Sequence, residues 1–231
     1  MLILWIILFL LILGISFALA YSSMKDYQLT PQANRIHEHG LYLIRNPSLF
    51  NINFLTNLHK ILVEDKQIIS FERLFKGGES ALVVFGSQEF LKPLTDQLSL
   101  VELEDYSDIN KNLVYAWEVD LKNEETFLQE PGDIFKDFPH LLPQEQFFWQ
   151  VVIMAGNENE FRIQIRAVFV SNDSKRRKEI GEILQNFNPN MIKLPKDFSS
   201  IQILELYQKR SLSQEKAITL KTASIIKLLK L

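Results

Sequence analysis

The sequence predicts an α+β fold in which an N-terminal transmembrane helix precedes two tandem units, each with the element order β-α-β-β-α-β. Two observations predict this fold. All 25 Lys and Arg residues and all 28 Asp and Glu residues lie after Tyr21, so residues 1–21 form a charge-free apolar segment. Downstream, the apolar positions alternate between the two-residue period of strands and the three- to four-residue period of helices. We therefore expect a membrane segment followed by folded units of mixed structure.

The apolar segment has the length of a membrane span. A helix over residues 2–21 would be about 30 Å long, which is the thickness of a bilayer hydrocarbon core. The Ala18-x-Ala20 pattern leaves a cleaved secretory signal open as an alternative. Secretory signals normally carry Lys or Arg before the apolar run, however, and this sequence has neither there. Lys25 and Arg35 follow the segment, so the positive-inside rule predicts a single-pass protein of the cell membrane with a cytoplasmic soluble part.

The composition of the chain excludes several classes of protein. The sequence contains no cysteine, so it can form neither a disulfide framework nor a thiolate metal site. A formal net charge of −3 gives no reason to expect nucleic-acid binding. A hydrophobic fraction of 47% supplies ample core material for folded units.

The first folded unit is predicted over residues 41–107, after a polar linker at residues 22–40. Strands are expected at 41–44, 68–75, 81–85 and 100–106, and helices at 54–62 and 90–98. Gly77 and Gly78 form a hairpin turn, because glycine tolerates positive φ.

The second unit is predicted over residues 112–210. Strands are expected at 113–121, 147–154, 161–170 and 201–207, and helices at 132–142 and from the capping candidates Asn172 and Asp173 to Phe187. Both units have the ferredoxin-like order, in which two helices pack on one face of a four-stranded antiparallel sheet. A C-terminal basic amphipathic helix is expected at 217–231. It could rest on a membrane, dock on a partner or pack on its own sheet.

Cationic and polar side chains on the second unit and the last helix are candidates for partner binding. One group alternates on the strand at 161–170, and a cationic run occupies 175–178; the simpler interpretations are a solvent-facing sheet side and a solvated helical turn. The candidates are Arg162, Gln164, Arg166, Lys175, Arg176, Arg177, Lys178, Lys221, Lys227 and Lys230.

The sequence shows no catalytic motif, so we expect no enzyme, no cofactor and no small-molecule substrate. It has neither a G-x-S-x-G motif nor a phosphate-binding loop. His37 and His39 resemble a ligand pair but lack a third ligand nearby, and His59 and His140 look incidental. Glu102, Glu104 and Asp105 are the carboxylates that an unrecognised membrane enzyme would use.

Several short sequence segments, taken in their order along the chain, resemble those of a known protein family. The segments are Arg45-Asn46-Pro47, Ile69-Ser70-Phe71-Glu72, Leu103-Glu104-Asp105-Tyr106, Phe148-Trp149-Gln150-Val151-Val152-Ile153 and Ile165-Arg166-Ala167-Val168-Phe169-Val170. In this order, after an anchor, they are similar to the membrane-proximal domain of type IV secretion and conjugation coupling-type ATPases of candidate-phyla bacteria. Residues 218–231 resemble the segment that leads into the motor.

The resemblance implies a role, although the ATPase domain itself has no counterpart here. It implies a non-catalytic, membrane-anchored accessory protein that tethers or scaffolds a hexameric P-loop ATPase, or that self-associates. The alternative is an envelope-facing binding module, anchored or secreted, with no relation to secretion motors.

Overall fold

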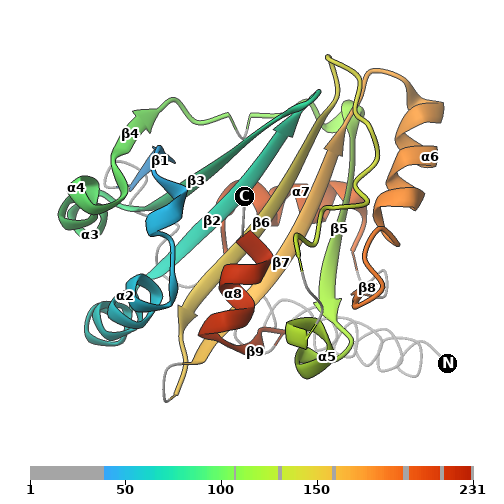
Figure 1. Ribbon diagram of the computed structural model, residues 1–231. Coiled ribbons are helices and arrows are strands. Elements are labelled where there is room, and N and C mark those ends of the chain that lie inside the picture. The colour runs from blue at the N-terminus through green and yellow to red at the C-terminus, as the bar shows by residue number, and fades with distance from the viewer. Residues whose placement is uncertain are drawn as a thin grey trace, which may run out of the picture.

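The computed structural model describes residues 39–106, 108–129, 132–157, 160–194, 198–213 and 216–229. These residues form an α+β structure around one antiparallel sheet of nine strands, with helices on both faces (Figure 1). The strands are β1 His39–Ile44, β2 Ile68–Lys76, β3 Glu79–Ser87, β4 Leu100–Leu103, β5 Val114–Leu121, β6 Gln146–Ala155, β7 Glu160–Val170, β8 Met191–Lys193 and β9 Ile218–Lys221. The α-helices are α2 Ile52–Asp65, α3 Gln88–Leu91, α4 Thr95–Leu98, α5 Glu124–Gln129, α6 Ser174–Leu184, α7 Ser200–Lys209 and α8 Thr222–Leu229.

The predicted fold class of two separate ferredoxin-like units is wrong. The two predicted units do not have separate four-stranded sheets, because β2 pairs with β6 from Ile68↔Met154 to Lys76↔Gln146. The single sheet has the order β4-β1-β3-β2-β6-β7-β5-β8, with β9 paired to β7. In addition, none of the helices in the described part of the chain is long and apolar enough to cross a membrane, and the predicted transmembrane segment 1–21 lies outside that part.

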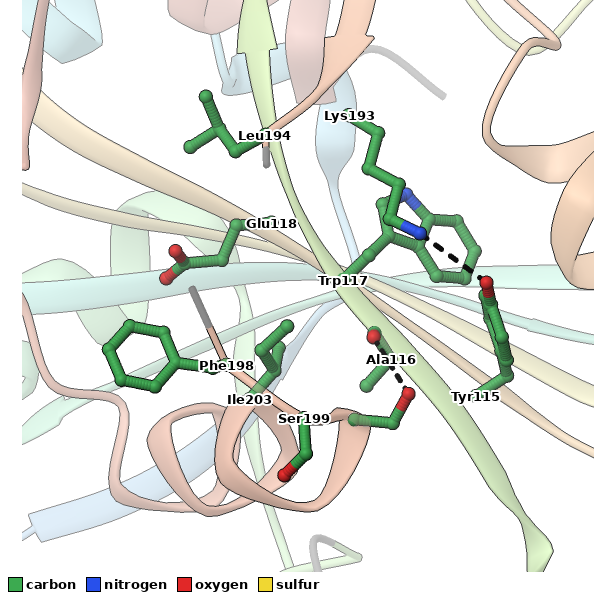
Figure 2. Close-up of a pocket in the computed structure, with 10 residues that line it drawn as sticks. Tyr115, Ala116, Trp117, Glu118, Lys193, Leu194, Phe198, Ser199 and Ile203 are labelled. Atoms are coloured by element: carbon green, nitrogen blue, oxygen red, sulfur yellow. Dashed lines mark hydrogen bonds between the residues drawn. The ribbon is translucent and has the colours of Figure 1, made fainter. Parts of the chain in front are cut away.

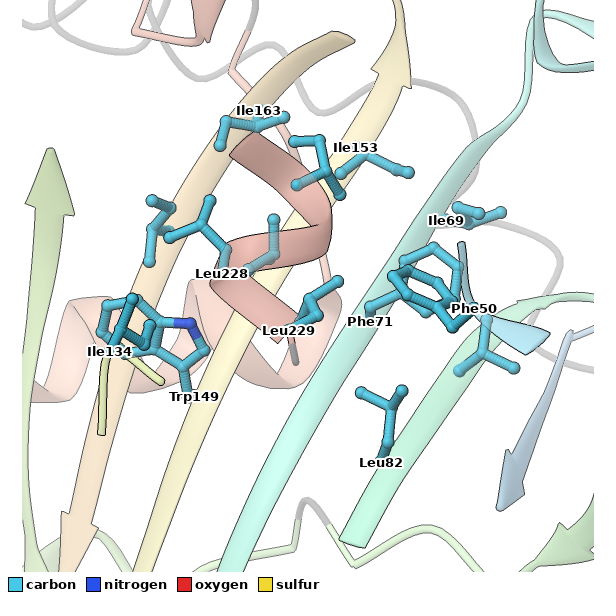
Figure 3. Packing of buried hydrophobic residues seen from close by; sticks show 14 of the residues in the cluster. Phe50, Ile69, Phe71, Leu82, Ile134, Trp149, Ile153, Ile163, Leu228 and Leu229 are labelled. Atoms are coloured by element: carbon cyan, nitrogen blue, oxygen red, sulfur yellow. The ribbon is translucent and has the colours of Figure 1, made fainter. Parts of the chain in front are cut away.

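The main hydrophobic core lies on the sheet face that α2, α5, α6 and α8 cover. Alternate residues of the central strands, such as Phe71, Trp149 and Ile163, point into it and pack against Leu228 and Leu229 of α8 (Figure 3). Burial of such side chains stabilises a fold by about 1.5–3 kcal/mol each. The opposite face carries α7, which lies behind the strands in Figure 1.

Three predicted elements are corrected. Residues 201–207 are not a closing strand but part of α7, whose N-terminus has a capping box between Ser199 and Gln202. Residues 132–142 are not helical; the helix of that connection is α5. The predicted helix at 217–231 begins as strand β9 and becomes helical only at Thr222.

Helix α8 belongs to the core of the domain. Ile225, Leu228 and Leu229 are fully buried, and the helix contacts α2, α5 and β2. Of the three alternatives left open by its sequence, the structure places this helix on its own sheet.

Candidate functional site

Four buried polar side chains form a row across the sheet face that α7 covers. The strand register places Glu72 opposite Gln150, Gln150 opposite Arg166, and Arg166 opposite Glu118, so the row crosses β2, β6, β7 and β5. None of the four is more than 8% exposed. Side chains directly opposite one another on neighbouring antiparallel strands are close enough to interact. We call these four residues the polar row.

Glu72 is the acceptor at the β2 end of the polar row. Its carboxylate accepts hydrogen bonds from Ser70 Oγ at 2.9 Å, Gln150 Nε2 at 3.1 Å and Tyr207 Oη at 3.3 Å, and also from Tyr106 Oη. A buried carboxylate requires such donors, because an unpaired charge in the interior costs several kcal/mol (about 3–5 when one partner of a pair is removed).

Arg210 extends the polar row from Glu72 towards the surface. This residue ends α7 in the left-handed conformation, with φ of 49°. Its Nε donates to Glu72 at 2.8 Å, and its two terminal nitrogens donate to Asp105 at 2.8 and 3.0 Å. Burial alone would lower the pKa of Arg210, but the charges of Glu72 and Asp105 outweigh it and raise that pKa above its ordinary value.

Arg166 occupies the centre of the row and ties α7 to the sheet. It donates to Gln150 Oε1 at 3.2 Å, to the Leu206 carbonyl at 3.3 Å and to Gln164 Oε1 at 3.0 Å, and its Nε lies 3.4 Å from Glu118. Gln164 Oε1 also accepts from the Ser213 amide at 2.8 Å.

Tyr207 of α7 lies over the polar row, where its hydroxyl donates to Glu72. It is fully buried, and burial together with the negative charge of Glu72 raises the pKa of its hydroxyl well above the ordinary value, so it remains a neutral donor. The charges of the polar row thus satisfy one another, and the network fastens α7 and the segment after it to the centre of the sheet.

The structure separates the predicted partner-binding residues into distinct environments. Gln164 and Arg166 lie under α7, where no partner could reach them, and Arg162 of the same strand face is half-buried. Lys221 is exposed, whereas Lys227 is half-buried against Phe127, whose carbonyl accepts from it. Lys230 lies outside the described residues.

The cationic run on α6 also divides in two. Lys175 and Lys178 are exposed. Arg176 forms a salt bridge to buried Glu145 at 2.9 Å, and Arg177 donates to the Ser171 carbonyl at 2.6 Å. Only the two lysines of the run therefore project into solvent as a contact surface would require.

Glu145 is held as a carboxylate by its surroundings. Burial would raise its pKa, but hydrogen bonds from Arg176, the Leu142 amide and Ser171, together with the charge of Arg176, outweigh burial and lower the pKa below the ordinary value. The first turn of α6 is thereby fixed to the loop before β6. This ion pair was not predicted, because the sequence does not show which loop lies beside α6.

The histidines and carboxylates singled out in the sequence are dispersed. His59 is buried; its Nε2 lies 2.9 Å from the Glu160 carbonyl, and its ring packs edge-on against Phe161. His39 stacks on Phe85, and His37 is not among the described residues. Asp105 binds Arg210 rather than pairing with Glu102 or Glu104. Over the described residues, no three His, Asp or Glu side chains group as metal ligands would.

A cavity of about 420 Å³ lies at the Glu118 end of the polar row. It is bounded by the outer edge of β5, by Lys193 at the end of β8 and Leu194 after it, and by the first turn of α7 (Figure 2). Ser200 Oγ donates to the Ala116 carbonyl at 3.2 Å on one side, and Lys193 Nζ reaches Tyr115 Oη at 3.4 Å on the other. The volume is within the range of small-molecule sites, which is about 300–1,000 Å³.

No protein-family model matches this sequence, and a search of the curated proteins found no match.

Proposed function

We propose that this chain is a non-catalytic, single-pass membrane protein whose folded domain serves as an assembly platform at the cytoplasmic face. The observation that carries the proposal is the charge-free segment at residues 1–21, which has the length and composition of a membrane span. Lys25 and Arg35, which follow the segment, favour a cytoplasmic domain. Tethering raises the local concentration of the domain, so weak contacts can recruit a partner.

The partner surface that we propose is the solvent face of α6. Lys175 and Lys178 are exposed there, one helical turn apart, while Arg176 and Arg177 bind the domain itself. Glu179 and Glu182 are exposed on the same helix, so this surface is mixed in charge. The family resemblance makes a hexameric P-loop ATPase of a type IV secretion or conjugation system our proposed partner, with self-association as the other mode.

The tether is tested by placing charges in the apolar segment. Each arginine at the centre of a membrane helix costs about 2.5–3.5 kcal/mol of insertion. We expect the full chain to stay in the membrane fraction after alkaline carbonate extraction and the Leu10→Arg/Leu13→Arg variant to be released. The matched control is Ile52→Arg/Val63→Arg, which adds two charges at exposed positions of α2 and should stay in the membrane. Release of the unaltered chain would reject the tether.

A second candidate function is favoured by the cavity beside β5. A cavity of about 420 Å³ with polar and apolar lining suits an envelope-facing binding module. A domain on the outer side of the membrane would be out of reach of a cytoplasmic motor, so the side on which the domain lies distinguishes the two functions.

A further inference from the structure

We propose that the cavity beside β5 binds a small organic carboxylate, with the carboxylate at Lys193 and Tyr115 and an apolar body against Ile203. This inference is independent of the tethering role, because it rests only on the folded domain.

The cavity fills a gap in the sheet. β8 pairs with β5 only from Val119 to Leu121, so no strand of the described part of the chain lies beside the outer edge of β5 at residues 115–118. The first turn of α7 covers the lower end of this gap, and Leu194 covers the upper end (Figure 2). A ligand can therefore lie beside the strand without displacing any described element.

The polar groups at the Tyr115 end of the cavity are hydrogen-bond donors. Tyr115 Oη accepts from Gln185 Nε2 at 2.9 Å and from Lys193 Nζ at 3.4 Å. With both lone pairs used, its own proton is left to donate. Lys193 keeps two further N–H groups, and among the described residues no carboxylate lies within ion-pair distance of it. A positive charge beside a phenol donor fits an anionic acceptor.

The acid that lines the cavity does not compete for the ammonium group. The carboxylate of Glu118 is directed to the far side, where its Oε1 lies 3.4 Å from Arg166 Nε (Figure 2). The polar row thus neutralises Glu118 from behind, and among the described residues no other acid of the cavity lining opposes the positive charge of Lys193.

The wall between these polar groups is apolar. Ile203 and Phe198 line the α7 side, and Leu194 lines the opposite side (Figure 2). An apolar body of the ligand would be sheltered from water here, while its carboxylate reaches Lys193.

An added peptide strand is disfavoured as the occupant. A strand that pairs with β5 needs both its carbonyl and its amide groups to find partners. Along the open edge, the Ala116 carbonyl already accepts from Ser200 Oγ, and the Glu118 carbonyl accepts from the Leu194 amide at 3.1 Å. The amide groups of an incoming strand would therefore meet carbonyls that each already accept one hydrogen bond, whereas a carboxylate has no amide group to satisfy.

The test uses 3-phenylpropionate as the probe, with the neutral 3-phenylpropan-1-ol as its match in shape. Both are titrated into the full chain in lipid nanodiscs, and methyl NMR follows Ile203 and Leu194. We expect the acid to shift these resonances at millimolar concentration, to leave exposed Ile52 unaffected, and to bind about tenfold or more tightly than the alcohol.

Two lysine substitutions test whether the positive charge of Lys193 binds the acid. Lys193→Met should weaken binding of the acid about tenfold or more, whereas the matched control Lys178→Met, at an exposed lysine of α6, should leave it unchanged. Three results would each overturn the proposal: no shift at the cavity methyls, equal binding of acid and alcohol, or undiminished binding by a folded Lys193→Met variant. The comparison of acid with alcohol needs no variant, so it tests the preference of the cavity for a carboxylate even if Lys193→Met does not fold.

Discussion

At the scale of single residues, Glu72 is the most sensitive position of the polar row. Five donors meet at its carboxylate, including Arg210 Nε at 2.8 Å. Glu72→Gln removes the charge opposite Arg210 and places an NH₂ group among donors. We expect a loss of about 3–5 kcal/mol in the free energy of unfolding, measured by urea denaturation.

The control for this substitution is Glu205→Gln. Glu205 forms an exposed ion pair with Lys111 at 2.8 Å, on the same helix that the polar row holds. Solvent screens such a pair, so its loss should leave the urea midpoint nearly unchanged. Equal effects of the two substitutions would mean that the polar row is not a stabilising network.

Glu145 makes stability depend on pH. Its pKa is lower in the folded state than the ordinary value of 4.5. A lowered carboxyl pKa contributes stability that is present above the unfolded value and is lost as pH falls through the folded value. Glu145→Gln should therefore be less stable than the unaltered chain at pH 7, and the difference should shrink below about pH 4.5. Urea midpoints measured between pH 7 and pH 3 check this; a difference that does not change with pH would contradict it.

At the scale of elements, α8 is expected to behave as part of the core. Leu228 is fully buried between α8 and the sheet. Leu228→Ala should lower the free energy of unfolding by about 2–5 kcal/mol through the cavity that it leaves. The control Lys221→Ala, at an exposed position of β9, should have little effect. A helix used only for docking on a partner would tolerate Leu228→Ala in the isolated protein.

The elements show where sequence patterns suffice and where they fail. The alternation at 161–170 and the glycines at 77–78 correctly predict β7 and the β2–β3 hairpin, because both signals are local. The same alternation suggests that Gln164 and Arg166 face solvent, since the sequence does not show that α7 covers them. The helical signal for α7 was present in the Ser199–Gln202 capping box and in the spacing of Ile203, Leu204 and Tyr207.

At the scale of the whole molecule, the β2–β6 pairing joins the two halves of the domain. The sequence does not reveal this pairing, because the apolar pattern of a strand indicates which of its faces is buried but not which strand lies beside it. The cavity was equally beyond prediction, since it is formed by β5, the end of β8 and α7, which are distant in sequence. With one shared sheet and one main core, both halves should unfold together.

Calorimetry tests this cooperativity. Leu58→Ala in α2 and Phe127→Ala in α5 each remove a buried side chain from one half of the domain. We expect a single transition for the unaltered chain, and each substitution should move that same transition to lower temperature. Two separate transitions, of which each substitution moves only one, would indicate independent halves.

The proposed function depends most on the side of the membrane that the domain occupies. Because the sequence contains no cysteine, Glu64→Cys, at an exposed position of α2, introduces a single thiol into the full chain. A membrane-impermeant maleimide then reports which side the thiol faces. We expect labelling in inverted membrane vesicles and none in intact spheroplasts. Labelling in intact spheroplasts would place the domain outside, contradict the cytoplasmic assembly platform and favour the envelope-facing binding module.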